Sequence, residues 1–252
     1  MTTNSRSSTP PRARRNPGAN NGTAAPRESR GPAGVANDEL AFAQAPLRRL
    51  PAQQRSMVRV QRMLDCCADL LDEVGYDNLS TTRIAERAGV AIGSVYQFFP
   101  DKKAITQALG LRFLDQFSSR VTERLADASF THWTVAVDAI IDEYIDMHRN
   151  VPGFRSLHFG DIVDPRLLSG GSDNNRVISV RLRRIIVSVT GIPDDDELDR
   201  AIHVAVEAAD AVLKLAFRDN PDGDPALVYE AKRLVSSYLS HFSERNGGDH
   251  PW

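Results

Sequence analysis

The stretch from Ser80 to Lys102 restricts the fold more than any other segment, because it predicts two short helices joined by a tight turn. Ser80 or Thr81 can cap the first helix, since either hydroxyl can accept a hydrogen bond from an unpaired amide at the helix start. Gly89 follows that helix at the position where a left-handed backbone carries no steric cost for glycine. Pro100 ends the second helix, because the residue before a proline is disfavoured in the α region. This layout is that of a helix-turn-helix.

The apolar positions of the same stretch fit this motif. Ala85, Gly89 and Val95 place a small residue where the helices touch, a glycine at the turn and an apolar anchor beneath the second helix. Taken alone, these three residues also fit an ordinary helical hairpin. The wider pattern resembles the TetR family of bacterial transcriptional regulators at Thr81, Ile84, Ala85, Ala88, Gly89, Val90, Gly93, Tyr96, Phe99 and Lys102.

The resemblance implies that the second helix lies in the major groove of DNA, which admits an α-helix and displays distinguishable base edges. Gln97 can pair with an adenine, whereas Tyr96 and Lys102 hold phosphates and set the register. Two residues depart from the family pattern, because Ala91 replaces a polar capping residue and Ile92 replaces a common Lys, Arg or Gln. These departures leave the operator sequence open. The expected DNA-binding residues are Thr81, Thr82, Ile92, Gly93, Ser94, Tyr96, Gln97 and Lys102.

Outside this stretch, apolar residues recur at steps of three and four, the spacing of a helix with one buried face. No alternating strand pattern is present in the sequence. The sequence therefore predicts an all-α fold, with a three-helix helix-turn-helix domain followed by a helical ligand-binding and dimerisation domain. The expected helical segments beyond the motif are 53–74, 101–126, 131–149, 152–160, 166–189, 194–216 and 227–242.

Charge and composition change along the chain. Residues 1–52 carry eight Lys or Arg and three Asp or Glu, a charge of +5, with few large apolar side chains. Residues 106–252 carry sixteen basic and twenty-three acidic residues, a charge of −7. A basic end and an acidic body fit a protein that touches nucleic acid at one end only. The expected parts are a disordered basic tail at 1–52 with a short helix at 38–50, a DNA-binding domain at 53–105, a ligand-binding and dimerisation domain at 106–245, and a disordered tail at 246–252.

Several other protein classes have no support in the sequence. No run approaches the roughly 18 apolar residues of a membrane-spanning helix. The first residues contain no apolar segment, so we expect neither a secretory signal nor a membrane partner, and we expect a cytoplasmic protein. Cys66 and Cys67 are adjacent on a helical pattern and point about 100° apart, which favours neither a disulfide nor a chelate.

The family resemblance extends to the second domain only as a compatible order of helices. It implies a homodimer on a palindromic operator and a cavity for a small apolar or amphipathic effector. Ordinary core packing is the alternative for every cavity residue. The expected ligand-binding residues are Phe113, Phe117, Trp133, Tyr144, His148, Phe154, His158 and Phe159. The expected dimer interface is Ala205, Ala208, Val212, Leu234, Tyr238 and Phe242.

No pattern in the sequence predicts catalysis, a metal site or a cofactor. None of the histidines has the paired spacing of a common zinc site, and no nucleophile elbow, phosphate loop or dinucleotide-binding strand is present. We therefore expect a repressor that an effector releases from DNA. Two alternatives remain open: a constitutive DNA-binding regulator or activator without an effector, and a helical enzyme that carries the motif without using it.

Overall fold

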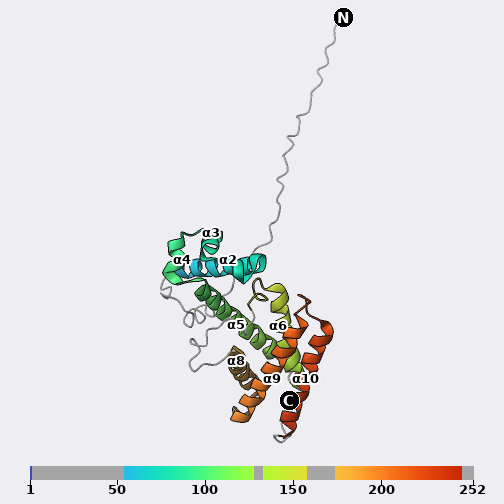
Figure 1. The fold of residues 1–252 in the computed structure, drawn as a ribbon. Helices are drawn as coiled ribbons and strands as arrows, with labels where there is room; N and C mark the ends of the chain where they lie inside the picture. Colours follow the sequence, from blue (N-terminus) through green and yellow to red (C-terminus); the bar gives the residue numbers. More distant parts are fainter. Residues whose placement is uncertain (2–53, 128–132, 158–173, 246–252) are drawn as a thin grey trace.

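The computed structural model describes residues 54–127, 133–157 and 174–245, together with the isolated Met1. Every regular element in these ranges is an α-helix, which confirms the predicted all-α class (Figure 1). The predicted tails at 1–52 and 246–252 lie outside the described residues. The helices are α2 (Gln54–Asn78), α3 (Thr81–Ala88), α4 (Ile92–Phe98), α5 (Lys102–Asp127), α6 (Trp133–Asn150), α8 (Asn174–Thr190), α9 (Asp196–Ala216) and α10 (Pro225–Arg245).

Local hydrogen bonds define the turn between α3 and α4. The Ser80 hydroxyl accepts a hydrogen bond from the amide of Arg83 at 3.2 Å and caps the start of α3. At the other end Gly89 has φ 65° and ψ 38°, in the left-handed region. The amide of Val90 donates to the carbonyl of Ala85 at 3.0 Å, which completes a Schellman motif. Both predicted ends of this helix are confirmed.

Helix α2 packs behind the motif and completes a unit of α2, α3 and α4, called the head below (Figure 1). Gly75, with φ 72° and ψ 172°, interrupts α2 at the predicted place. Glu73 accepts two hydrogen bonds from Arg87 of α3, at 2.8 and 2.6 Å. These bonds lower the pKa of the Glu73 carboxyl and raise the pKa of the Arg87 guanidinium. The buried side chains of α2 are Val60, Met63, Leu64, Cys66, Cys67, Ala68, Leu70 and Leu71.

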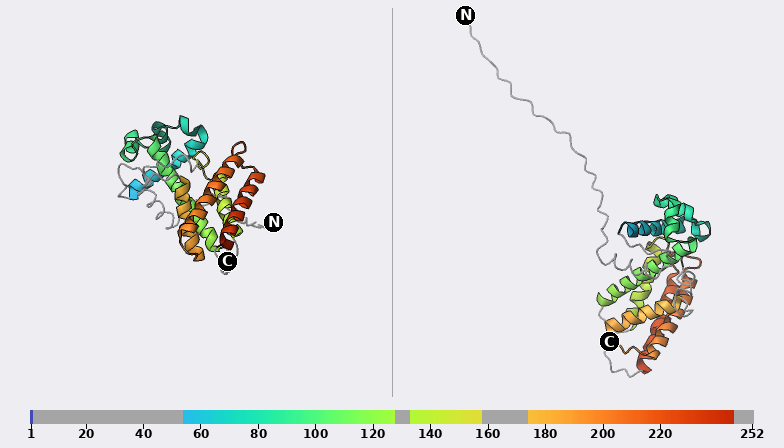
Figure 2. Two further views of the ribbon diagram at one scale, coloured as in Figure 1. Left: turned by 60° about the horizontal axis from the view of Figure 1, so that its bottom comes forward. Right: turned by 90° about the vertical axis from the view of Figure 1, so that its left-hand side faces the viewer.

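Helix α5 joins the head to the remaining helices, called the body. Asp101 caps α5 as predicted, because its Oδ1 accepts a hydrogen bond from the amide of Ala104 at 2.8 Å. In its first half α5 packs on α2, where Arg112 donates to Asp65 at 2.6 Å. Further along, it packs on α6 and α8 of the body (Figures 1 and 2). A single helix therefore contacts both parts of the molecule.

The body is a helical bundle in which α9 lies between α8 and α10 (Figure 1). Asp195 caps α9 by accepting hydrogen bonds from the amides of Glu197 and Leu198, at 3.0 and 2.8 Å. The prediction of a helix at 152–160 is wrong in its described part, because residues 151–157 form consecutive turns. Gly153 explains the difference, since its φ of 77° lies in the left-handed region, outside that of a right-handed helix.

Candidate functional site

The outer face of α4 carries most of the residues predicted to bind DNA. Ile92 and Tyr96 leave 40% and 43% of their surface exposed, and Gln97 is exposed beside them. Gly93 has no atom within 4 Å of the position that a Cβ would occupy, so the backbone is open to close approach there. Ser94 is half-buried. These side chains share one surface, because the opposite face of the helix is in the core.

The inner face of α4 fixes the helix on the head. Val95 is fully buried, and Phe98 and Phe99 leave at most 2% of their surface exposed. Phe98 could contact a base only if its side chain faced outward. Its burial assigns it to the core.

Residues of α3 and α5 border the α4 face. The Thr81 and Tyr96 hydroxyls lie 3.1 Å apart in a hydrogen bond that couples α3 to α4, and Thr82 is exposed next to them. Lys102 is held differently, because its ammonium donates to the carbonyl of Tyr76 at 2.9 Å and lies 4.3 Å from the centre of the Tyr76 ring. Lys102 thus connects the start of α5 to the last turn of α2.

Three arginines of α2 border a groove that reaches the start of α4. Arg55, Arg59 and Arg62 line this groove together with Val58, Gly89, Val90, Ala91 and Ser94. A Cβ on Gly89 would lie 3.5 Å from an Arg62 guanidinium nitrogen, so the turn and this arginine are neighbours. The sequence alone favours an ordinary solvent-exposed face for the three arginines. Their spacing of four and three residues put them on one side of α2, but only the tertiary packing of α2 on the turn brings that side next to α4.

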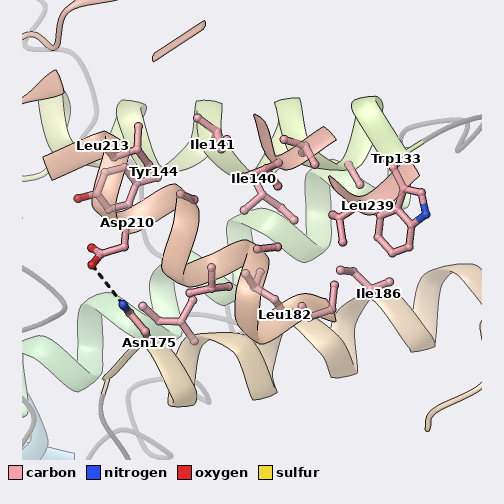
Figure 3. A pocket seen from close by; sticks show the side chains of 18 of the residues that line it. Trp133, Ile140, Ile141, Tyr144, Asn175, Leu182, Ile186, Asp210, Leu213 and Leu239 are labelled. Atoms are coloured by element: carbon pink, nitrogen blue, oxygen red, sulfur yellow. Dashed lines mark hydrogen bonds between the residues drawn. The ribbon is translucent and has the colours of Figure 1, made fainter. Parts of the chain in front are cut away.

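A cavity of about 100 Å³ lies inside the body, between α5, α6, α8, α9 and α10 (Figure 3). Its wall is almost entirely apolar, with Asn175, Asp210 and Tyr144 at one end and Trp133 and Ile186 toward the other. The lining residues are Phe117, Trp133, Ala136, Val137, Ile140, Ile141, Tyr144, Asn175, Ile178, Leu182, Ile186, Ile202, Ala205, Val206, Ala209, Asp210, Leu213, Val235 and Leu239.

Only part of the predicted ligand-binding set lines this cavity. Phe117, Trp133 and Tyr144 are on its wall. The remaining described members, Phe113, His148 and Phe154, are buried in an aromatic cluster beside it rather than on its wall. His158 and Phe159 lie outside the described residues. The sequence missed Asn175 and Asp210, because each is a polar residue on an otherwise ordinary helical pattern.

The aromatic cluster links the cavity to the head. Tyr144 lies 5.7 Å from Phe154 between ring centres, and Phe154 lies 5.5 Å from Phe113 of α5, both edge to face. Phe154 belongs to residues 151–157, which we call the strap. The strap presses on α2, because a Cβ on Gly153 would lie 2.8 Å from the Cα and carbonyl oxygen of Ala68. Tyr144 on the cavity wall therefore contacts the strap, and the strap in turn contacts α2 of the head.

Two polar contacts hold the strap on α2 as well. The Ser156 hydroxyl donates to the carbonyl of Leu71 at 3.3 Å, and Arg155 pairs with Asp72 at the same distance. Together with the packing at Gly153, these contacts give the body a second connection to the head besides α5.

The outer faces of α9 and α10 carry exposed apolar residues. Leu234 and Tyr238, both predicted at the dimer interface, leave 47% and 39% of their surface exposed. Ala208 and Val212 are half-buried, whereas Ala205 is buried and lines the cavity. The Phe242 side chain lies outside the described part. The exposed apolar residues of α9 are instead Val204, Ala211 and Leu215, and the half-buried Ala208 lies on the same stripe.

The described ranges offer little for metal or thiol chemistry. They contain no group of three His, Cys, Asp or Glu that could hold a metal ion. Cys66 and Cys67 are both buried free thiols, and burial raises the pKa of Cys67 to about 12. None of the helices within the same ranges has the length and apolar character to cross a membrane.

Two family descriptions match the chain. Residues 64–109 match bacterial regulatory proteins of the tetR family, and residues 131–243 match a tetracyclin repressor-like C-terminal domain. The crystal structure of a TetR-family transcriptional regulator from Streptomyces coelicolor is similar at 44% identity and a TM-score of 0.65, over 74% of this chain and 98% of that one.

More distant relatives share the fold or match part of the sequence. A TetR transcriptional regulator from Rhodococcus sp. RHA1 shares the fold at 20% identity and a TM-score of 0.56, over 74% of this chain and 97% of that one. YvdT, an uncharacterized HTH-type transcriptional regulator of Bacillus subtilis, is 31% identical over 34% of this chain and 43% of its own length. The chain spans about half the length, or less, of the curated relatives it matches.

Proposed function

The chain belongs to the TetR family of transcriptional regulators, and we propose that it is a homodimeric repressor released from a palindromic operator by a small-molecule ligand. One observation carries the DNA-binding part: α4 is anchored by buried Val95 and turns Ile92, Tyr96 and Gln97 outward on a single face. A short helix held in this way can enter the major groove. Because its target is DNA, we also propose that the protein acts in the cytoplasm.

The residues around this face make two kinds of contact in this proposal, with base edges and with phosphates. Gln97 reads a base edge, and the exposed Ile92 contacts a thymine methyl group. Tyr96, Thr81 and Thr82 hold phosphates, with the hydrogen bond between Thr81 and Tyr96 setting the hydroxyl geometry. The backbone at Gly93 and the Ser94 hydroxyl approach the same groove.

Two further contributions come from basic side chains near this face. The groove of Arg55, Arg59 and Arg62 supplies positive charge along the flanking phosphates, which strengthens binding to any DNA sequence. Lys102 acts chiefly by fixing α5 against Tyr76.

The dimer is proposed to form through α9 and α10. Val204, Leu215, Leu234 and Tyr238 are large apolar side chains left 39–48% exposed on these two neighbouring helices. A four-helix bundle between two copies would bury them, and Ala208 would allow close approach. A two-fold axis then places two α4 helices on one side, so the operator is a palindrome with half-sites one helical turn or more apart.

Ligand control is proposed to work by expansion of the cavity. A space of about 100 Å³ is smaller than the ~300–1,000 Å³ of most ligand pockets, so a larger ligand requires the body helices to move apart. Such a ligand binds the expanded state more tightly and shifts the population toward it. The movement reaches the head through α5, on which Phe117 lines the cavity, and through the strap, on which Phe154 touches Tyr144.

A selection of genomic DNA fragments with the purified protein tests the DNA-binding proposal. We expect the chain to enrich one palindrome, and an Ile92→Ala, Gln97→Ala double variant to lose that enrichment while keeping its fold. Glu123→Ala serves as a surface control, because Glu123 is exposed on the far end of α5, away from α4 and from the proposed dimer interface. Absence of any enriched sequence with the unaltered protein would reject the proposal.

The small volume of the cavity also favours a second candidate function. A constitutive DNA-binding dimer, repressor or activator, needs no effector and tolerates a nearly filled body. Enrichment of a palindrome that no tested compound releases would support this alternative over a ligand-controlled repressor.

A further inference from the structure

The polar end of the cavity is built from three helices. Asn175 comes from the start of α8, Asp210 comes from α9, and Tyr144 comes from α6 (Figure 3). Glu207 of α9 contacts Asn175 without lining the cavity. Asn175, Asp210 and Tyr144 all line the cavity. Asn175 leaves only 9% of its surface exposed, which makes it the one buried amide on a wall that is otherwise mostly aliphatic.

The side-chain amide of Asn175 has hydrogen-bond partners for its nitrogen but none for its oxygen among the described residues. Its Nδ2 donates to Glu207 Oε2 at 2.9 Å and to Asp210 Oδ2 at 3.1 Å, so both protons are used. The opposite amide orientation would place a carbonyl oxygen against two carboxylates, which excludes it. The Oδ1 oxygen is buried and accepts no hydrogen bond from any described residue. A buried acceptor without a donor is costly, so this position favours a donor group from a ligand.

The charges around this end oppose an anion. Glu207 and Asp210 are both acidic, and the cation paired with Asp210 is Lys214, 2.7 Å away and largely on the surface. Glu207 faces His203 on its other side, at 3.4 Å. Burial, and then the charge of Asp210, raise the pKa of the Tyr144 hydroxyl, so that hydroxyl stays neutral. A carboxylate here would meet an acidic, acceptor-rich wall.

The rest of the cavity suits a short apolar body. From the polar end, Ile140, Ile141 and Leu182 lead toward Trp133 and Ile186 (Figure 3). An engineered apolar cavity of about 150 Å³ admits benzene, so about 100 Å³ holds only a few heavy atoms before the walls must yield.

We propose that this cavity binds a ligand with a short apolar body and one hydrogen-bond-donating head group, a protonated amine or a hydroxyl, placed between Asn175 Oδ1 and Asp210. It discriminates against the carboxylate of the same body. The inference rests on the proposed ligand control and adds the chemistry of the head group. The protonated amine is charged and the hydroxyl is neutral, so Asp210 favours the amine. Asn175 Oδ1 can accept a hydrogen bond from either group.

The test is a binding series in which only the head group changes: hexan-1-amine, hexan-1-ol and hexanoate. Binding is measured by calorimetry and by the fluorescence of Trp133 in a Trp252→Phe background, which leaves Trp133 as the single tryptophan. We expect the amine and the alcohol to bind at least about tenfold more tightly than hexanoate, equivalent to ~1.4 kcal/mol. Equal or tighter binding of hexanoate, or no binding of any of the three, overturns the inference.

Variants locate the effect at the polar end. Asn175→Leu should weaken the amine and the alcohol by a similar factor, about tenfold, because it removes their shared acceptor. Asp210→Asn should weaken the amine more than the alcohol. Asp142→Asn is the control, since Asp142 is also paired with a lysine, Lys232 at 2.6 Å, but does not line the cavity. Equal effects of the Asp210 and Asp142 variants on amine binding overturn the assignment.

Failure of this inference is distinguishable from failure of the proposed function. All three binding measurements are made without DNA, and fragment enrichment is measured without ligand. A protein that enriches a palindrome and prefers hexanoate keeps its proposed function and loses this head-group assignment.

Discussion

The head and the body bury different kinds of side chains. In the described residues, every buried side chain of the head is apolar, from Val60 of α2 to Phe99 after α4. All the buried polar or charged side chains there begin at Thr106 and belong to the body or to α5: Thr106, Gln107, Arg112, Glu143, His148, Asn175, Ser179 and Ser236. The head turns its polar groups outward on α4, whereas the body holds polar groups inward around a cavity.

This difference explains how one chain can combine a fixed reading surface with a variable interior. An apolar, closely packed interior has one preferred arrangement, which keeps the α4 face rigid. A cavity with an unsatisfied buried acceptor at Asn175 leaves the body able to gain contacts when a ligand enters. Rigidity suits the DNA-binding surface, and adaptability suits the proposed ligand-binding site.

The largest expected effect lies where the two regions meet. Gly153→Ala should lower the free energy of unfolding by about 3 kcal/mol, because its Cβ would meet Ala68 at 2.8 Å and the backbone has φ 77°. Gly191→Ala is the matched control, with φ 72° and no atom within 4 Å of the Cβ, and should cost about 1 kcal/mol. Urea unfolding measures both. Equal losses would show that the strap does not press on α2.

The second prediction compares the apolar core of the head with the interior of the body around the cavity. Val95→Thr places a hydroxyl in the apolar core of the head and should cost about 2 kcal/mol, since the buried side chains of the head are all apolar and only a backbone carbonyl of α4 could accept its hydrogen bond. Val206→Thr makes the same change on the half-buried wall of the cavity and should cost less than about 1 kcal/mol. Thermal and urea unfolding decide the order. A larger loss at Val206 would contradict the comparison.

A smaller effect concerns the reading face itself. Gln97→Ala should remove roughly 1–2 kcal/mol of discrimination at one base pair of each half-site. Tyr96→Phe should instead weaken binding to all sequences alike, because its hydroxyl is assigned to phosphates through the contact with Thr81. Affinities for the selected operator and its single-base variants separate the two patterns. Uniform weakening by Gln97→Ala would remove it from the base-reading set.

The smallest effect is the pH dependence of an ion pair between α8 and α9. A hydrogen bond from Arg176 at 2.7 Å, with the charges of Arg176 and Arg183, lowers the pKa of Asp199 below its ordinary 3.8. A depressed pKa adds stability above the ordinary value, and this gain is lost as the pH falls through the folded-state pKa. Because the pair is near the surface, we expect less than about 1 kcal/mol.

Urea midpoints of the unaltered chain and Asp199→Asn measure this contribution. The two proteins should differ near neutral pH and converge in acid below the ordinary pKa of Asp199. A difference that stays constant across this range would assign the effect to packing instead.

Local signals made the head predictable from sequence. Ser80, Gly89 and Asp101 act within three or four residues of themselves, so capping and left-handed backbone could be assigned without knowing the tertiary structure. The buried anchor Val95 followed from the spacing of the motif. The residues predicted on α4 accordingly share one face, although their contacts with DNA remain a prediction.

Features that depend on several helices were predicted less well. The cavity wall contains residues of five helices. Asn175 and Asp210 form its polar end only because α8 packs against α9. On α9 the alanine pattern placed Ala205 in the dimer interface, but the packing of α8 and α10 turns it inward and leaves Val204 exposed. A helical pattern identifies an apolar face without saying which neighbour covers it.

The central claim is that occupation of the cavity in the body changes the affinity of the head for DNA. Its most direct test is the affinity of the purified protein for its selected operator, measured with and without saturating hexan-1-amine. We expect a loss of about 5- to 150-fold, with the operator reducing amine affinity by the same factor. An unchanged operator affinity, while Trp133 reports a filled cavity, would contradict the account.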